Sequence, residues 1–169
     1  MGGIRANGQV WLINPNGILF GAGSRVDVSG LVASTHNMSD RAFMESTNGR
    51  FEFSESGRAN AAVVNEGTIT VRNAGIAALV APAVRNAGTI NAQLGRVGLA
   101  SANRFTLDLY GDRLINIAVA DRVMGNAVDA QGRPVLAGVE NSGAIMADGG
   151  RVEISANVAR GVVDNVIRM

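Results

Sequence analysis

The chain has 169 residues, which favours a single domain, and 47% apolar against 17% charged residues argue against a chain disordered by excess charge. Its 15 basic residues are all arginine, nearly balance 14 acidic ones and are spread along the sequence, which argues against a polybasic binder of nucleic acid or membrane surfaces. The chain has no cysteine, which excludes disulfides and thiolate chemistry, and no apolar run long enough for a membrane span.

The first predicted feature is a turn at Asn14-Pro15-Asn16-Gly17-Ile18. Proline presets φ and Asn-Gly tolerates a positive φ, so this pentapeptide has the composition of a β-turn.

The next stretch, Thr35–Ala62, does not follow the repeat described below. Ser39 begins a segment that favours a short capped helix, and Arg50–Glu55 alternates like an exposed strand. We expect both to be extra elements packed outside the main fold, in an excursion near residues 35–62.

Three later segments share the pattern Asn-x-Gly-x-Ile, beginning at Asn65, Asn86 and Asn141, and the first two start 21 residues apart. Each is followed by a glycine with apolar residues two and four positions on, which is the spacing of a β-strand. A period near 20 residues, made of short strands and Asn/Gly turns, is typical of a solenoid. We therefore predict an all-β fold, a right-handed parallel β-helix.

In such a fold equivalent residues of successive coils stack about 4.8 Å apart. We expect Ile69 and Ile90 to be inward neighbours, and the stacked asparagines to form a ladder of side-chain hydrogen bonds. Asparagine and glycine are expected to turn the chain because both accept a positive φ at low cost.

From Asn86 to Asn141 is 55 residues, which is 13 more than two periods, so we expect one coil there to carry a second excursion, near residues 107–140. The whole of residues 1–169 is interpreted as one β-helical domain. Near its end several apolar residues share one helical face, so a closing helix competes with a further β coil: Val158, Val162, Val163, Val166 and Ile167.

Candidate catalytic groups do not assemble in the sequence. His36 is the only histidine and lies in a polar segment after an apolar strand, so we interpret it as a surface-loop residue rather than a catalytic base. Polysaccharide-cleaving β-helices use carboxylates on adjacent coils, but the positions equivalent to Asp148 hold Arg72 and Gln93. We predict no catalytic residue, no cofactor and no metal site.

The first thirty-five residues carry the most specific pattern. The Asn14–Ile18 pentapeptide within Ala6–Gly21, followed by the Gly-Leu-Val-Ala-Ser-Thr run, resembles the secretion domain of filamentous haemagglutinin-like exoproteins, the two-partner secretion (TPS) or haemagglutination activity domain. The resemblance continues through Gln93–Val97 and Ala147–Val152 and covers nearly the whole chain. The signal peptide, first strands and Asn-Pro-Asn-Leu-type motif of that family have no counterpart in these residues, so we expect a domain truncated at its N-terminus.

The resemblance implies the N-terminal secretion domain of a large, adhesin-like or haemagglutinin-like bacterial exoprotein. Such a domain is recognised by the periplasmic domains of an outer-membrane transporter and seeds β-helix folding, and the exoprotein reaches the bacterial surface or the medium through the periplasm. The expected recognition motif is Asn14, Pro15, Asn16, Gly17 and Ile18. Contacts with a host surface or a glycan are expected of downstream regions, and no nucleic-acid partner is expected.

Two other functions stay open at this point. A carbohydrate-active β-helix enzyme would act on polyuronides or other glycans. A structural or adhesive solenoid without a secretion role would be exported equally well after deletion of residues 14–18. An adhesin, a haemolysin or a contact-dependent toxin would share the same secretion domain.

Overall fold

The computed structural model describes residues 2–46, 49–108, 126–157 and 165–169. Fifteen strands form three parallel five-stranded sheets, here called sheets A, B and C. Sheet A contains β1 (Gly3–Arg5), β4 (Arg25–Val28), β8 (Thr68–Val71), β11 (Thr89–Asn91) and β17 (Ala144–Met146). Sheet B contains β2 (Gln9–Ile13), β5 (Gly30–Ser34), β9 (Ile76–Ala81), β12 (Arg96–Ser101) and β18 (Arg151–Ala156). Sheet C contains β3 (Ile18–Phe20), β7 (Ala62–Asn65), β10 (Ala83–Asn86), β16 (Ala137–Asn141) and β19 (Asn165–Arg168).

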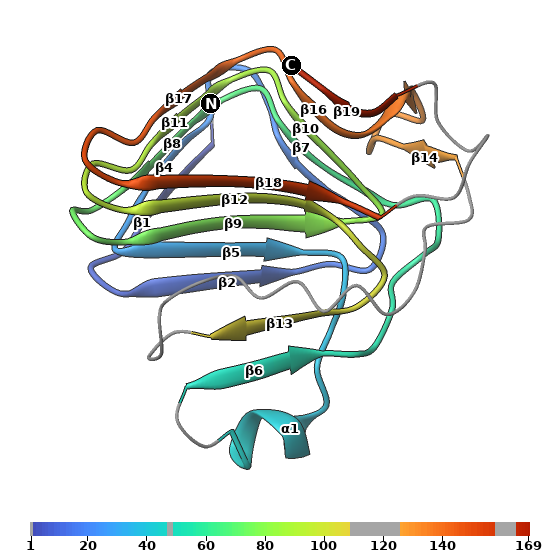
Figure 1. Cartoon of the computed structure of the whole chain (residues 1–169), viewed down its shortest axis with the longest axis horizontal. Coiled ribbons are helices and arrows are strands. Elements are labelled where there is room, and N and C mark those ends of the chain that lie inside the picture. The colour runs from blue at the N-terminus through green and yellow to red at the C-terminus, as the bar shows by residue number, and fades with distance from the viewer. Residues whose placement is uncertain (1, 47–48, 109–125, 158–164) are drawn as a thin grey trace.

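The chain visits sheets A, B and C in that order and then begins again, so each pass through the three sheets is one coil (Figure 1). Five coils stack in this way, with parallel pairing throughout the three sheets. The parallel β-helix predicted from the repeat is therefore confirmed.

Inward side chains of successive coils stack on their own kind. In sheet A, Ile90 pairs in register with Ile69 on one side and Ile145 on the other. Ile69 and Ile90 are completely buried, as the repeat predicted. Because full burial of such a side chain stabilises the fold by about 1.5–3 kcal/mol, these columns of aliphatic residues form the main core.

The three repeat asparagines form the expected ladder at the end of sheet C. The side-chain amide of Asn65 donates to Asn86 Oδ1 at 2.8 Å, and that of Asn86 donates to Asn141 Oδ1 at 2.7 Å. Asn65 and Asn86 are fully buried, so these bonds satisfy polar groups that water does not reach.

The glycines of the Asn-x-Gly units serve a different purpose from the one predicted. These three glycines are not among the described residues with positive φ; in the same repeats, positive φ occurs instead at the next corner, at Ala74 (61°), Leu94 (52°) and Gly149 (67°). A Cβ on Gly88 would overlap the carbonyl oxygen of Gly67 in the coil below. The repeat needs glycine there because the stacked backbones approach closely, and the expectation of positive φ was wrong.

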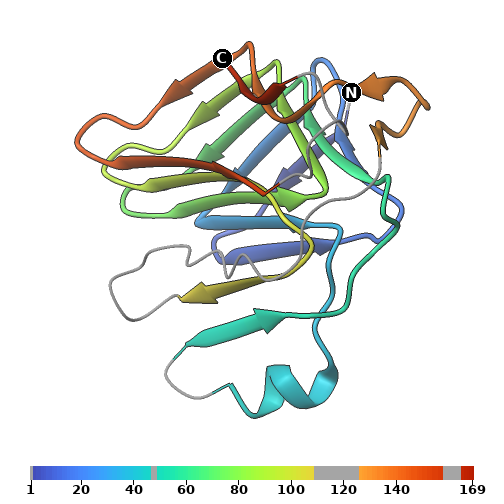
Figure 2. The same cartoon turned by 45° about the vertical axis from the view of Figure 1, so that its right-hand side comes forward.

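Two long connections leave the coils, both between sheet B and sheet C. The first, between β5 and β7, contains α1 (Asp40–Met44), whose N-terminus is capped by the hydroxyl of Ser39, and β6 (Arg50–Phe53). The second, between β12 and β16, contains β13 (Phe105–Asp108) and the hairpin of β14 (Ala127–Val128) and β15 (Pro134–Val135). Strands β6 and β13 pair antiparallel and join the two connections (Figure 2).

One coil, and not two, separates the last two repeat asparagines. Asn86 and Asn141 lie directly opposite each other in adjacent strands β10 and β16. The separation of 55 positions therefore corresponds to one enlarged coil and not, as the period suggested, to two coils with an insertion.

At the C-terminus, β19 is a parallel strand on β16, which favours the further coil over the closing helix for residues 165–168. Val158, Val162 and Val163, which contributed to the predicted helical face, lie outside the described residues.

Candidate functional site

The Asn14–Ile18 pentapeptide lies in the first coil, where the chain turns from β2 in sheet B to β3 in sheet C. The N–H of Gly17 donates to the carbonyl of Asn14 at 3.1 Å, which closes a four-residue turn. Inside it, the N–H of Asn16 donates to Asn14 Oδ1 at 3.0 Å, and Gly17 has a φ of 110°. The predicted β-turn is therefore present, and both asparagine and glycine are needed for its shape.

The turn divides the motif into an exposed and an anchored half. Asn14, Pro15 and Asn16 are exposed, whereas Gly17 is buried and Ile18 packs against the aliphatic core. We call the exposed half, Asn14–Asn16, the Asn-Pro-Asn tip. The N–H of Asn14 donates to the carbonyl of Ser34 in the next coil at 3.0 Å, so the tip has a fixed place on the β-helix.

The segment around Gly57 and Arg58, where the chain returns from the first excursion, packs against the tip. The N–H of Arg58 donates to the carbonyl of Pro15 at 3.0 Å. A Cβ on Gly57 would lie 3.0 Å from the Cα of Pro15, and one on Gly17 would lie 3.0 Å from the carbonyl oxygen of Ala62. Sequence reasoning missed this support, because no local pattern links Gly57 and Arg58 to a motif more than forty residues earlier.

The apolar residues flanking the tip are engaged in the fold. Trp11 projects from the outer face of sheet B and packs edge-on against Phe51, with ring centroids 4.8 Å apart. Leu12 and Phe20 contact the aliphatic core instead. The polar tip is therefore more exposed than its apolar neighbours.

His36 is not the surface-loop residue that the sequence suggested. It is completely buried where the chain leaves β5, with its ring edge-on to Phe105 at a centroid distance of 6.1 Å. Burial lowers its pKa to about 4, so the imidazole is neutral near pH 7. The polar sequence context misled because Phe105 arrives from the other excursion, far along the chain.

Asp148 does not stack on another carboxylate in the adjacent coil. The N–H of Leu94 donates to the carbonyl of Asp148 at 2.9 Å, which places Asp148 beside Gln93 rather than beside another acid. Within the described residues, His, Asp and Glu side chains nowhere gather in groups of three that could hold a metal ion.

Comparison with known proteins decides the family. The whole chain, residues 1–169, matches the TPS secretion domain. The chain belongs to this family. It is thus the secretion domain of a two-partner-secreted exoprotein, and the resemblance seen in the sequence is confirmed.

Two relatives from Haemophilus influenzae agree with this assignment. The heme/hemopexin-binding protein is 31% identical to this TPS domain over 136 residues, which are 78% of this chain and 15% of that protein. The crystal structure of the HMW1 secretion domain superposes with a TM-score of 0.63 at 29% identity, covering 88% of this chain and 38% of the other. The chain thus spans less than half of either relative.

The family places the domain in a secretion pathway. TPS domains are secreted through the periplasm and are recognised by outer-membrane transporters, and the family consists of secretion domains rather than enzymes. In the described part of the chain, helices are too short and too polar to cross a membrane.

Proposed function

We propose that the Asn-Pro-Asn tip is the part of this TPS domain that the periplasmic domains of its transporter bind. The observation that carries the proposal is the exposure of Asn14, Pro15 and Asn16 on a turn whose backbone is held by the neighbouring coil and by Arg58. A net charge of +1 gives little long-range steering, so recognition rests on short-range hydrogen bonds and shape.

Export with the cognate transporter tests the proposal. Asn16→Ala is the sharpest variant, because the Asn16 side chain has no hydrogen bond within the described structure while its backbone N–H shapes the turn. We expect it to reduce the secreted protein per cell without changing the unfolding midpoint. Asn14→Ala also removes the bond within the turn, and Gly17→Val is expected to be most damaging because of the positive φ and the nearby Ala62.

The matched control is Asn73→Ala, an exposed asparagine at a corner between sheets A and B. Arg133 is unsuitable as a distant control because it forms ion pairs with Glu66 and Asp129. Periplasmic amounts are followed to separate recognition from degradation. If all three motif variants were exported at the natural level, the pentapeptide would be a structural turn without a role in recognition.

We also propose that the last coil acts as a template for the remaining β-helix of the exoprotein. Val152 is 44% exposed, although its register partners Val97 and Ala77 in the inner coils are buried. A further coil would bury it, and each new coil would discourage backward movement of the exported chain. In the whole exoprotein, Val152→Asp should increase protease sensitivity just downstream, and equal resistance to protease would contradict the template.

In this proposal the domain itself catalyses nothing, so incubation with polyuronides should leave them uncleaved. Retention at the bacterial surface and adhesion to a host surface are proposed for other regions of the exoprotein.

A further inference from the structure

The three sheets differ in what lies on their outer faces. The outer face of sheet B is packed against Phe53, Phe105 and Leu107 of the β6–β13 pair. That of sheet C is packed against Ala127 and Val135 of the small hairpin. Among the described residues, the apolar clusters include no segment packed over the outer face of sheet A.

This outer face of sheet A is polar near the first coils. The register places two rows of outward residues side by side across the five strands. The first row is Gly3, Arg25, Thr68, Thr89 and Ala144, and the second is Arg5, Asp27, Thr70, Asn91 and Met146. Hydroxyl, amide and charged groups thus repeat at the strand spacing of about 4.8 Å.

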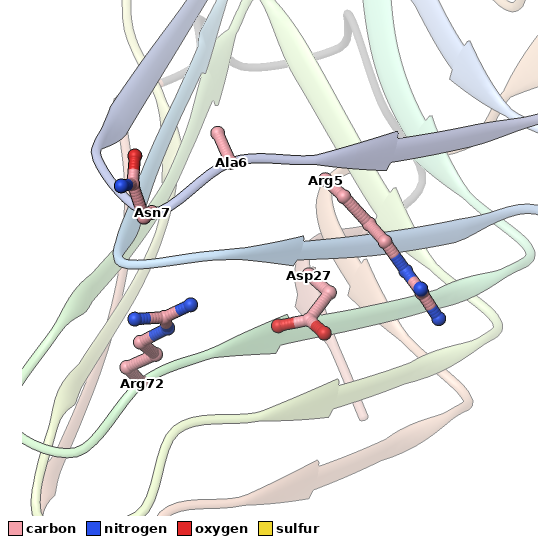
Figure 3. Close-up of a pocket in the computed structure, with 5 residues that line it drawn as sticks. All are labelled: Arg5, Ala6, Asn7, Asp27 and Arg72. Atoms are coloured by element: carbon pink, nitrogen blue, oxygen red, sulfur yellow. The ribbon is translucent and has the colours of Figure 1, made fainter.

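This end of the face is hollowed. One depression of about 680 Å³ is lined by residues that include Arg5, Arg25, Asp27, Thr68 and Thr70. A second, of about 370 Å³, is lined by Arg5, Ala6, Asn7, Asp27 and Arg72 (Figure 3). Because both share Arg5 and Asp27, they adjoin, and their sizes fall in the range of about 300–1,000 Å³ that is usual for ligand sites.

The charged groups of these depressions are not used by the fold. Arg85 and Arg133 are paired with Glu66, and Arg41 with Glu45. Within the described structure, by contrast, the guanidinium groups of Arg5, Arg25 and Arg72 and the carboxylate of Asp27 form no ion pair. In Figure 3 Asp27 lies between Arg5 and Arg72.

We propose that this face, called the Arg5–Arg72 face after two of its residues, binds an acidic oligosaccharide that carries carboxylate groups. Three arginines against one aspartate favour an anionic ligand, and guanidinium groups bind carboxylates through paired hydrogen bonds. The carboxylate of Asp27, which lies between Arg5 and Arg72, can accept hydrogen bonds from a ligand. The hydroxyl groups of a sugar can donate them. The threonine hydroxyls add further partners along an extended chain.

An acidic protein segment fits this face less well. Protein interfaces are centred on large aromatic or apolar side chains, and no such side chain lines either depression. The proposal is independent of transporter recognition, because the Asn-Pro-Asn tip lies at the corner between sheets B and C.

Isothermal titration calorimetry of the chain with octagalacturonate tests the proposal, with neutral maltooctaose and poly-glutamate as comparison ligands. We expect octagalacturonate to bind, and to bind more weakly as salt is added. Arg25→Gln and Arg72→Gln should each weaken binding about tenfold, because each removes charge-assisted hydrogen bonds.

The matched control is Arg41→Gln, which changes the net charge equally but lies on α1, with a side chain 83% exposed. It should bind octagalacturonate as the natural chain does, and all variants should keep the natural unfolding midpoint and export level. Absence of octagalacturonate binding would overturn the proposal. Equal weakening by Arg41→Gln, or equally tight binding of poly-glutamate, would overturn it as well.

Discussion

The side chain of Asn86 donates a hydrogen bond of 2.7 Å to Asn141, 55 residues later in the chain. The same side chain accepts a bond of 2.8 Å from Asn65, 21 residues earlier. One buried amide thus connects three coils across very different chain lengths, and the ladder holds the coil register through the second excursion.

Asn86→Ala should lower the free energy of unfolding by about 2–3 kcal/mol, because it leaves the amide of Asn65 and the oxygen of Asn141 without their side-chain partner. Urea unfolding followed by circular dichroism measures the change. The control Asn73→Ala removes an exposed asparagine and should change the free energy by less than about 0.5 kcal/mol. Equal stability of the two variants would show that the ladder contributes little.

Ala74→Gly should raise the free energy of unfolding by about 0.5–1 kcal/mol, because Ala74 has a φ of 61°, which glycine adopts without strain. Ala87→Gly is the matched control, since Ala87 is also exposed but is not among the residues with positive φ. It should be destabilising by a similar amount, because glycine has more freedom in the unfolded chain. A loss of stability in both variants would contradict the strain at Ala74.

His36 should make the fold sensitive to mild acid. The unfolded chain takes up a proton at this residue near pH 6.5, the folded chain only near pH 4, so stability falls as the pH decreases through that window. The loss is on the order of 3 kcal/mol and ends below the folded pKa.

Urea midpoints between pH 7.5 and 4 measure this loss in the natural chain and in His36→Phe, which keeps an aromatic ring beside Phe105 without a titrating nitrogen. We expect a shallower fall of the midpoint with acid in the variant. Identical pH dependence of the two proteins would assign the acid sensitivity to other groups.

Arg133→Ala should loosen the β14–β15 hairpin while the coils stay intact. Arg133 contacts Asp129 at 2.6 Å and Glu66 at 2.9 Å, and so ties the hairpin to sheet C. Hydrogen exchange should become several-fold faster at the N–H of Val128, which donates to Asn60, and unchanged at the N–H of Ile90 in sheet A. Unchanged exchange at Val128 would show that the apolar contacts hold the hairpin alone.

Acid should act on the same hairpin. Although burial alone would raise the pKa of Asp129, hydrogen bonds from Arg133 and Gln131 hold that pKa below its usual value. A depressed pKa stabilises the folded form above the unfolded pKa of Asp129, and this contribution disappears as the pH falls through the lower, folded pKa. In the Asp129→Asn variant, hydrogen exchange at the N–H of Val128 should therefore be as fast near neutral pH as it is in Arg133→Ala.

Sequence reasoning succeeded where the interaction repeats at a fixed spacing. The stacking of Ile69 on Ile90 and of Asn65 on Asn86 follows from a 21-residue period, because each coil contacts its neighbours alone. Sequence reasoning failed where a residue's partner lies in one of the two excursions, because the lengths of the excursions do not follow the repeat. The burial of His36 depends on Phe105, and the pairing of Arg133 depends on Glu66, 67 residues away.

The same limit applies to the site. The turn at Asn14–Gly17 could be predicted because its hydrogen bonds are local. The support from Arg58 and the grouping of Arg5, Arg25 and Arg72 on the outer face of sheet A could not, because both depend on which coils are adjacent.

Among the described connections, the largest differences in length occur at one corner of the β-helix. The connection from sheet B to sheet C is the Asn14–Gly17 turn in the first coil and the single residue Pro82 in the third, whereas the second and fourth coils carry the excursions there. Lengthening a loop costs only about 0.6 kcal/mol per doubling, so this corner tolerates insertions that the ladder would forbid elsewhere. An inserted epitope or tag is therefore expected to be tolerated best within the two excursions, which differ in length while the three sheets keep their register.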